Sequence, residues 1–156
     1  MIFVTVGTHN QGFDRLVKKM DEIAGDLEEE VVIQRGHTSY EPRNARFFDF
    51  ASREEMEEWV DKADIIVTHG GAGSIIFALS KNKPVVVVPR LRRYGEHVND
   101  HQIELAKALE KKGRVKAVLD VEDLNRCIQE VKGKTIISKK PVMVEEIKKY
   151  LRELEK

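Results

Sequence analysis

Glycine and serine residues gather in the segment His69-Gly70-Gly71-Ala72-Gly73-Ser74, which follows a short apolar run. We call residues 69–74 the glycine loop. Glycines let backbone N–H groups approach a ligand closely, and the start of a following helix attracts negative charge. The loop lacks the Lys of a P-loop and the third glycine of a dinucleotide-binding fingerprint. It indicates a phosphate or diphosphate site, and the alternative is a tight turn that only starts a helix.

A second stretch of this kind, Gly7-Thr8-His9-Asn10-Gln11-Gly12, follows the apolar run 2–6 and precedes a helical pattern. We call residues 7–12 the first polar loop. Loops at such positions often carry functional side chains, but a solvated polar loop would have the same composition. The sequence leaves both interpretations open.

A third stretch, residues 89–102, is dense in side chains that hydrogen-bond hydroxyl groups or pair with phosphate. We call it the second polar segment. Its candidate site residues are Arg90, Arg93, Glu96, His97, Asp100, His101 and Gln102. Each alone is typical of a solvated surface, whereas together, after a third apolar run, they suggest recognition of a polar ligand.

The sequence gives little support for a metal site or for a reactive cysteine. His97 and His101 are four residues apart, a spacing that could place two metal ligands on one helix face. Most of residues 89–99 is expected to be loop, however, and no His-Glu-x-x-His pattern occurs. The single cysteine, Cys127, excludes an internal disulfide and a cysteine-based zinc site. It lies on an apolar helix face, which favours core packing.

Apolar runs and helical patterns alternate along the whole chain. The expected strands are residues 2–6, 31–33, 46–50, 64–68, 84–88 and 115–119, and the expected helices are residues 13–23, 53–60, 74–80, 100–109, 121–131 and 142–154. Ser52 and Glu55 form a capping-box pattern before the second helix. The alternation predicts the α/β class, with a single doubly wound, mostly parallel Rossmann-like sheet in one domain over residues 1–156. In such sheets ligands bind where strands end, which is where the three polar stretches lie.

Composition limits the class of partner. The chain has 156 residues, 41% of them hydrophobic, and carries 27 basic and 27 acidic residues. This balance gives no support for nucleic acid as a partner. No apolar run approaches the roughly 18 residues of a spanning helix, and the first residues lack a signal-peptide pattern, so a cytoplasmic protein is expected.

The three polar stretches, in this order, resemble the C-terminal, donor-binding domain of family 28 glycosyltransferases, which is one half of a GT-B fold. The residues that carry the resemblance are 3–8 with Phe13 and Asp14, the glycine loop, and 100–102 with Glu104, Leu105 and Ala106. The chain is most similar to short members in which the donor half is a separate subunit. These include the exopolysaccharide subunit of the PssE type and the catalytic subunit of the dolichol-linked N-acetylglucosamine transferase.

The resemblance implies roles for individual positions. Gly70, Gly71, Gly73 and Ser74 would hold the diphosphate of a UDP-sugar, with Gly7 and Thr8 on the opposite side of the crevice. Asp100, His101 and Gln102 would bind the sugar, and the backbone near Phe50 would meet the uracil. Further substrate-site candidates are His69, Arg90, Arg93, Glu96 and His97. Many family members clamp the ribose with a Glu at the position of Phe77, so Glu96 is considered as a substitute.

The resemblance also implies an activity. The chain would be the catalytic, donor-binding subunit of an inverting glycosyltransferase that moves a sugar from UDP-GlcNAc or a related donor to a lipid-linked acceptor. It would need no metal or other cofactor and would work with a membrane-anchored acceptor-binding subunit, at the membrane surface. The general base is expected on that partner, with His9 as the local candidate. The expected helix 142–154 carries an apolar stripe of Val144, Ile147, Leu151 and Leu154, which would either dock the partner or pack on the chain's own sheet. The alternative is a non-catalytic UDP-sugar-binding or regulatory module.

Overall fold

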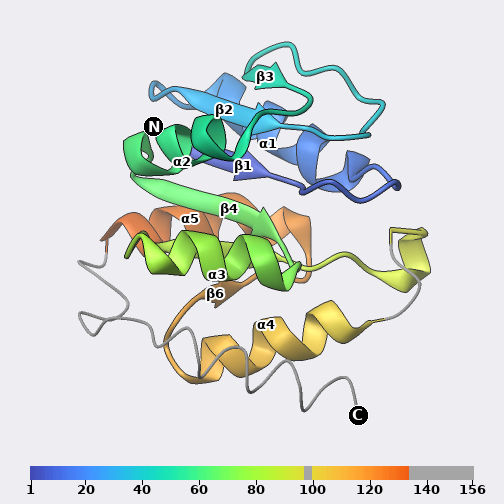
Figure 1. The fold of residues 1–156 in the computed structure, drawn as a ribbon, viewed down its shortest axis with the longest axis vertical. Helices are drawn as coiled ribbons and strands as arrows, with labels where there is room; N and C mark the ends of the chain where they lie inside the picture. The colour runs from blue at the N-terminus through green and yellow to red at the C-terminus, as the bar shows by residue number, and fades with distance from the viewer. Residues whose placement is uncertain (97–99, 134–156) are drawn as a thin grey trace.

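The computed structural model describes residues 1–96 and 100–133, which form one six-stranded sheet with helices on both faces (Figure 1). The helices and strands are β1 (Ile2–Thr5), α1 (Asp14–Asp26), β2 (Val31–Gln34), β3 (Arg46–Phe48), α2 (Arg53–Lys62), β4 (Ile65–His69), α3 (Ala72–Ser80), β5 (Val85–Val88), η1 (Arg92–Tyr94), α4 (His101–Lys111), β6 (Lys116–Ala117), η2 (Val121–Asp123) and α5 (Leu124–Gly133). His97 and the expected helix 142–154 lie outside the described residues.

The strand order is β3-β2-β1-β4-β5-β6, and every strand pair is parallel. Helices α1 and α5 pack on one face with Ile2 and Val4, whereas α2, α3 and α4 pack on the other with Phe3. Because both faces are covered, β1, β4 and β5 are buried throughout, as their continuous apolar runs predict. The predicted doubly wound α/β fold is confirmed.

Local signals explain most element boundaries. The Ser52 hydroxyl accepts a hydrogen bond from the N–H of Glu55, so the predicted capping box starts α2. Helix α3 begins at Ala72, two residues before the predicted start, because Gly71 is its N-cap. Strand β6 is shorter than predicted. Cys127 is buried in the core, as expected, and burial raises the pKa of its thiol. Within the described ranges no helix is both long enough and apolar enough to span a membrane.

Candidate functional site

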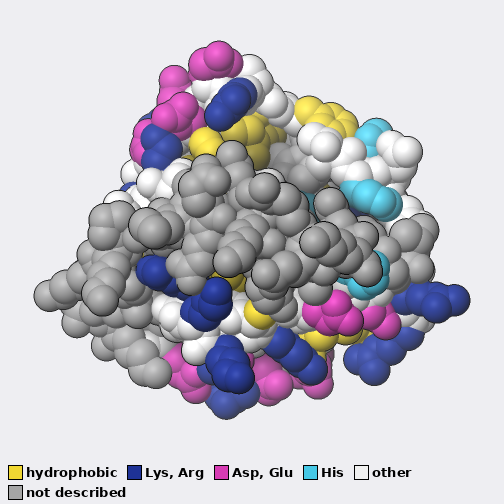
Figure 2. All heavy atoms as spheres, turned by 60° about the horizontal axis from the view of Figure 1, so that its bottom comes forward, with side chains coloured by type: hydrophobic (Ala, Val, Ile, Leu, Met, Phe, Trp, Pro, Cys, Tyr) yellow, Lys and Arg dark blue, Asp and Glu magenta, His cyan; other side chains and the backbone are white. Residues whose placement is uncertain are grey.

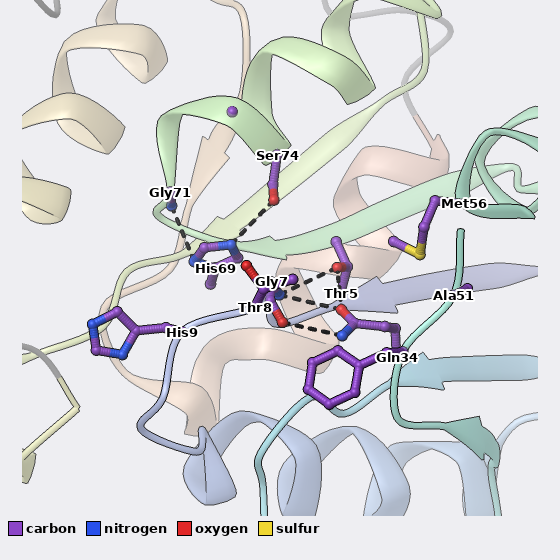
Figure 3. Close-up of a pocket in the computed structure, with 12 residues that line it drawn as sticks. Thr5, Gly7, Thr8, His9, Gln34, Ala51, Met56, His69, Gly71 and Ser74 are labelled. Carbon is purple, nitrogen blue, oxygen red and sulfur yellow. Dashed lines mark hydrogen bonds between the residues drawn. The ribbon is translucent and has the colours of Figure 1, made fainter. Parts of the chain in front are cut away.

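A cavity of about 480 Å³ opens at the carboxyl edge of the sheet, where β1 and β4 lie side by side (Figure 3). Its lining residues are Thr5, Gly7, Thr8, His9, Gln34, Phe50, Ala51, Met56, His69, Gly71, Gly73 and Ser74. The chain runs outward from β1 to β3 on one side and from β4 to β6 on the other, so this point is the topological switch of the sheet. The structure therefore brings the first polar loop and the glycine loop to one cavity.

Gln34, at the end of β2, organises the floor of this cavity. Its Oε1 accepts hydrogen bonds from the Thr5 hydroxyl (2.6 Å) and from the N–H groups of Val6 and Gly7 (3.2 Å each). Its Nε2 donates to the carbonyls of Gly7 (3.0 Å) and Asp49 (2.9 Å). The side chain is 2% exposed, so these bonds replace its contacts with water. The sequence alone did not identify Gln34 as a site residue. The only signal for it is a polar residue at the end of an apolar strand.

His69 links the end of β4 to the start of α3. Its Nδ1 accepts a hydrogen bond from the N–H of Gly71 (3.2 Å), and its Nε2 lies 3.1 Å from the Ser74 hydroxyl oxygen. An accepting Nδ1 carries no proton, so the neutral ring holds its proton on Nε2 and donates it to Ser74. The Ser74 hydroxyl, which accepts from His69, is then oriented to donate its own hydrogen elsewhere. Figure 3 shows this hydroxyl and the His69 ring pointing toward one another.

The three glycines of the glycine loop have different surroundings. A Cβ on Gly71 would lie 2.2 Å from the His69 ring, and one on Gly70 would lie 2.6 Å from the Gln102 Cβ. A Cβ on Gly73 would meet no atom within 4 Å among the described residues. Gly71 and Gly70 therefore make room for protein side chains, and only Gly73 keeps open space above the start of α3. This differs from the expectation that all three make room for one ligand.

The start of α3 is suited to an anion. In the described part of the chain no side chain caps this helix, so its first N–H groups have no side-chain acceptor. None of the described residues that line the cavity is Asp or Glu, although the chain has 27 acidic residues. The helix dipole and these N–H groups therefore face the cavity without a competing negative charge.

A second cavity of about 420 Å³ continues along α3 and shares Met56, Gly73 and Ser74 with the first. Arg53 and Phe77 are among its other lining residues. A group extending from the start of α3 could therefore run past Phe77, where the resemblance would lead one to expect Glu. Phe50, which is 49% exposed, lines the first cavity. Its ring packs edge-on against the His37 ring, with 5.0 Å between the ring centroids.

The second polar segment is largely held by contacts within the protein. Arg90 is 1% exposed and donates hydrogen bonds to backbone carbonyls, while burial lowers the pKa of its guanidinium. Glu96 is also buried, where its carboxylate accepts two hydrogen bonds from Arg15 (3.0 Å each) and one from the N–H of Leu91. Neither residue lines the cavity at β1 and β4. The structure thus differs from the expectation that Arg90 and Glu96 meet substrate, because both are buried against the protein's own groups.

Of the three predicted sugar-binding residues, one is held against the backbone and two are exposed. Gln102 accepts a hydrogen bond from the N–H of Arg90 (2.9 Å), which ties its side chain to the backbone. Asp100 accepts one from the N–H of Arg92 (3.0 Å) but is exposed, as is His101. Arg93 is exposed too, with its guanidinium 4.8 Å above the Tyr94 ring. These exposed side chains follow β5, the strand next to β4, outside the lining of the cavity.

His9 lines the cavity from the first polar loop, and its Nδ1 accepts a hydrogen bond from the N–H of Gln11 (3.1 Å). The neutral ring in this arrangement carries its proton on Nε2, so that nitrogen is a donor. In Figure 3 the His9 ring points away from the His69 ring. The geometry suits donation to an oxygen atom better than removal of a proton.

Histidine side chains gather at one side of the face shown in Figure 2, whereas acidic and basic side chains are interspersed elsewhere on it. The described histidines are His9, His37, His69 and His101. The first three lie at the end of a strand or shortly after one, and His101 is the first residue of α4. Within residues 1–96 and 100–133, no three His, Cys, Asp or Glu side chains form a group that could hold a metal ion. His97 lies outside those ranges, so the His97–His101 pairing stays a sequence-level alternative.

The fold and this cavity agree with the family comparison. Residues 1–151 match the model of the glycosyltransferase family 28 C-terminal domain, and the chain belongs to this family.

Among curated relatives, the UDP-N-acetylglucosamine transferase subunit ALG13 of Mus musculus is 34% identical over 126 residues. The match covers 72% of this chain and 10% of the mouse protein, so the chain spans about a tenth of that relative's length. The solution NMR structure of ALG13 has a TM-score of 0.63 at 19% identity, covering 98% of this chain and 94% of the other. MurG of Acinetobacter baumannii has a TM-score of 0.58 at 22% identity, covering 83% and 40%. These structures share the fold.

Proposed function

We propose that this chain is the donor-binding subunit of an inverting glycosyltransferase, which moves N-acetylglucosamine or a related sugar from its UDP donor to a lipid-linked acceptor. The observation that carries the proposal is the acid-free cavity at the β1–β4 switch, into which the uncapped start of α3 opens. Membership of the family and the similarity to a UDP-N-acetylglucosamine transferase subunit of the mouse support a UDP-sugar as the donor. The inverting reaction and the lipid-linked acceptor are proposed from the resemblance to the split members of this family.

The diphosphate of the donor would lie at the start of α3. Backbone N–H groups near Gly73 and the Ser74 hydroxyl are the donors on that side, and Gly7 and Thr8 line the opposite side. His69 would act through Ser74, whose hydroxyl hydrogen it directs away from itself. Preorganised donors of this kind bind a charged leaving group more tightly as charge develops on it in the transition state.

In the transfer step the acceptor hydroxyl would attack the anomeric carbon as the bond from that carbon to the diphosphate breaks. The α3 dipole would stabilise the charge left on UDP. His9, with its proton on Nε2, would donate to an oxygen of the leaving group or sugar. Removal of the acceptor's proton is therefore assigned to the partner subunit. The exposed Asp100 and His101 are the candidates for the sugar hydroxyls.

The acceptor would be held by a separate, membrane-anchored polypeptide, which would keep this chain at the membrane surface. The mouse relative is a transferase subunit, which supports a partner polypeptide. The apolar stripe of the expected helix 142–154 remains a predicted docking element, outside the described residues.

Two experiments test the proposal in order. A panel of UDP-sugars is first added to the purified chain, and a ligand at 100 times its Kd should stabilise the fold by about 2.7 kcal/mol. Transfer to a lipid acceptor is then measured with and without the acceptor-binding subunit, and turnover should require both. Binding without turnover in the complex would favour the non-catalytic module, and absence of binding to every UDP-sugar would refute the proposed function.

A further inference from the structure

Arg90 is a buried cation directly after β5, and its guanidinium reaches across to the loop that follows β1. Its Nη2 donates a hydrogen bond to the carbonyl of Val6 (2.9 Å), and its Nη1 donates to the carbonyls of Gln11 (3.0 Å) and Gly12 (3.1 Å). Nη1 also lies 3.4 Å from the Glu96 carbonyl. Arg90 therefore holds both ends of the first polar loop.

The same residue holds the second polar segment. The backbone N–H of Arg90 donates to the Gln102 side chain in the first turn of α4, and the Gln102 Cβ lies against Gly70 of the glycine loop. Glu96, whose carbonyl Arg90 contacts, is paired through its carboxylate with Arg15 of α1. Arg90 thus contacts the first polar loop and the second polar segment directly, and it reaches the glycine loop only through Gln102.

A simple tether would not need a buried guanidinium, because desolvating a cation is costly unless several acceptors replace water. Here the carbonyl oxygens replace water around Nη1 and Nη2, and the Phe13 ring lies 4.9 Å from the guanidinium carbon. The Nε of Arg90 has no hydrogen-bond partner among the described residues. The planar fork of Arg matches several acceptors at once, whereas a Lys ammonium is a single point.

The first polar loop has two independent anchors. Gln34 holds its start through the N–H and carbonyl of Gly7, and Arg90 holds Val6, just before the loop, together with its end. Thr8 and His9, which line the cavity, lie between these anchors. Among the described residues, neither the start of α3 nor Ser74 is hydrogen-bonded to Arg90, and both lie on the other side of the cavity. Loosening Arg90 would therefore free the His9 side of the cavity while leaving the α3 side in place.

On this basis we propose that Arg90 is a positioning residue for the transfer step, which fixes the first polar loop, with Thr8 and His9, against the donor cavity. The proposal rests on the proposed function for its reaction. Its consequence is that Arg90 acts on turnover more than on nucleotide affinity, because the proposed diphosphate donors at the start of α3 are held by other residues.

The test compares Arg90→Lys, which keeps the charge and loses the fork, with Arg126→Lys as a matched control, since Arg126 is 65% exposed on α5. In Arg90→Lys, amide hydrogen exchange of residues 8–12 should quicken at least about tenfold as the loop opens locally. In the full complex kcat should fall about 10- to 100-fold, because small misplacements of reacting groups have effects of that size. The KM for the UDP-sugar and the Kd for UDP should stay within about threefold. The control should match the wild type throughout.

Unchanged exchange of residues 8–12, or unchanged kcat, in Arg90→Lys would overturn the proposal. So would a kcat loss accompanied by an equal loss of UDP affinity, since that pattern marks a general structural defect. If the wild type binds no UDP-sugar at all, the proposed function fails. In contrast, a wild type that binds and turns over beside an unaffected Arg90→Lys variant refutes the assignment of Arg90 alone.

Discussion

Gly73 gives the sharpest test of where the diphosphate lies, because a methyl group there should raise stability and weaken UDP binding at once. The residue lies in the first turn of α3, and a Cβ on it would enter open space on the cavity side. Gly within a helix is less favourable than Ala by about 0.5–1 kcal/mol. Gly73→Ala should therefore melt up to about 4 °C higher than the wild type without ligand, given the length of the chain.

With UDP present the order should reverse. The wild type should gain about 2.7 kcal/mol at 100 times its Kd. Gly73→Ala should gain much less, and the larger Gly73→Val should gain nothing, because the side chain occupies the space above the N–H groups. Gly71→Ala is the matched control, since its Cβ would collide with the buried His69 ring and should lower the melting temperature without ligand.

Calorimetric titration with UDP and thermal melts of the same three variants measure both effects. Normal UDP affinity in Gly73→Val would refute the placement of the diphosphate at the start of α3. A Gly73→Ala variant that is destabilised but still binds UDP would show that a Cβ at this position does not enter open space.

Three other substitutions follow from the same structure. His101→Ala should weaken UDP-sugar binding about three- to tenfold more than UDP binding by calorimetry, and equal losses would exclude His101 from the sugar side. Gln34→Leu should lower the free energy of unfolding by at least about 2 kcal/mol in urea melts, since it leaves buried groups of the first polar loop unpaired, and an unchanged midpoint would contradict that role. For Asp21, burial raises the carboxyl pKa, but hydrogen bonds from the N–H groups of residues 43–45 and from the Tyr40 hydroxyl lower it, and the net shift is downward. The carboxylate therefore stabilises the fold fully above its unfolded pKa, near 3.8, and loses that contribution as the pH falls through the lower folded value. Asp21→Asn should cost about 3 kcal/mol at pH 7 and less at pH 3, and a pH-independent difference would contradict the ionised state.

The fold and the meeting of two loops were predictable because parallel strands bring their carboxyl ends to one edge. The runs 2–6 and 64–68 are apolar and are followed by Gly7 and the glycine loop, so both loops had to lie at that edge. Their adjacency needed only that the two strands be neighbours, which β1 and β4 are.

The roles of individual residues were less predictable, because they depend on side chains from other elements. Arg90 and Glu96 have the composition of ligand-binding residues, and nothing in their local sequence reveals that both are buried. Gly71 leaves room for the ring of His69, its near neighbour in sequence, but Gly70 leaves room for Gln102, which comes from the distant helix α4. Gln34 stood alone at the end of an apolar strand, where a buried polar side chain needs partners that the sequence does not identify.

A titration of the isotope-labelled chain with UDP, followed through backbone amide chemical shifts, tests the central claim most directly. The largest changes should fall on Gly7, Thr8, Gly71, Gly73 and Ser74, the residues of the two loops that line the β1–β4 cavity. Changes confined to residues 116–117 of β6, at the far edge of the sheet, or no changes at millimolar UDP, would contradict the account.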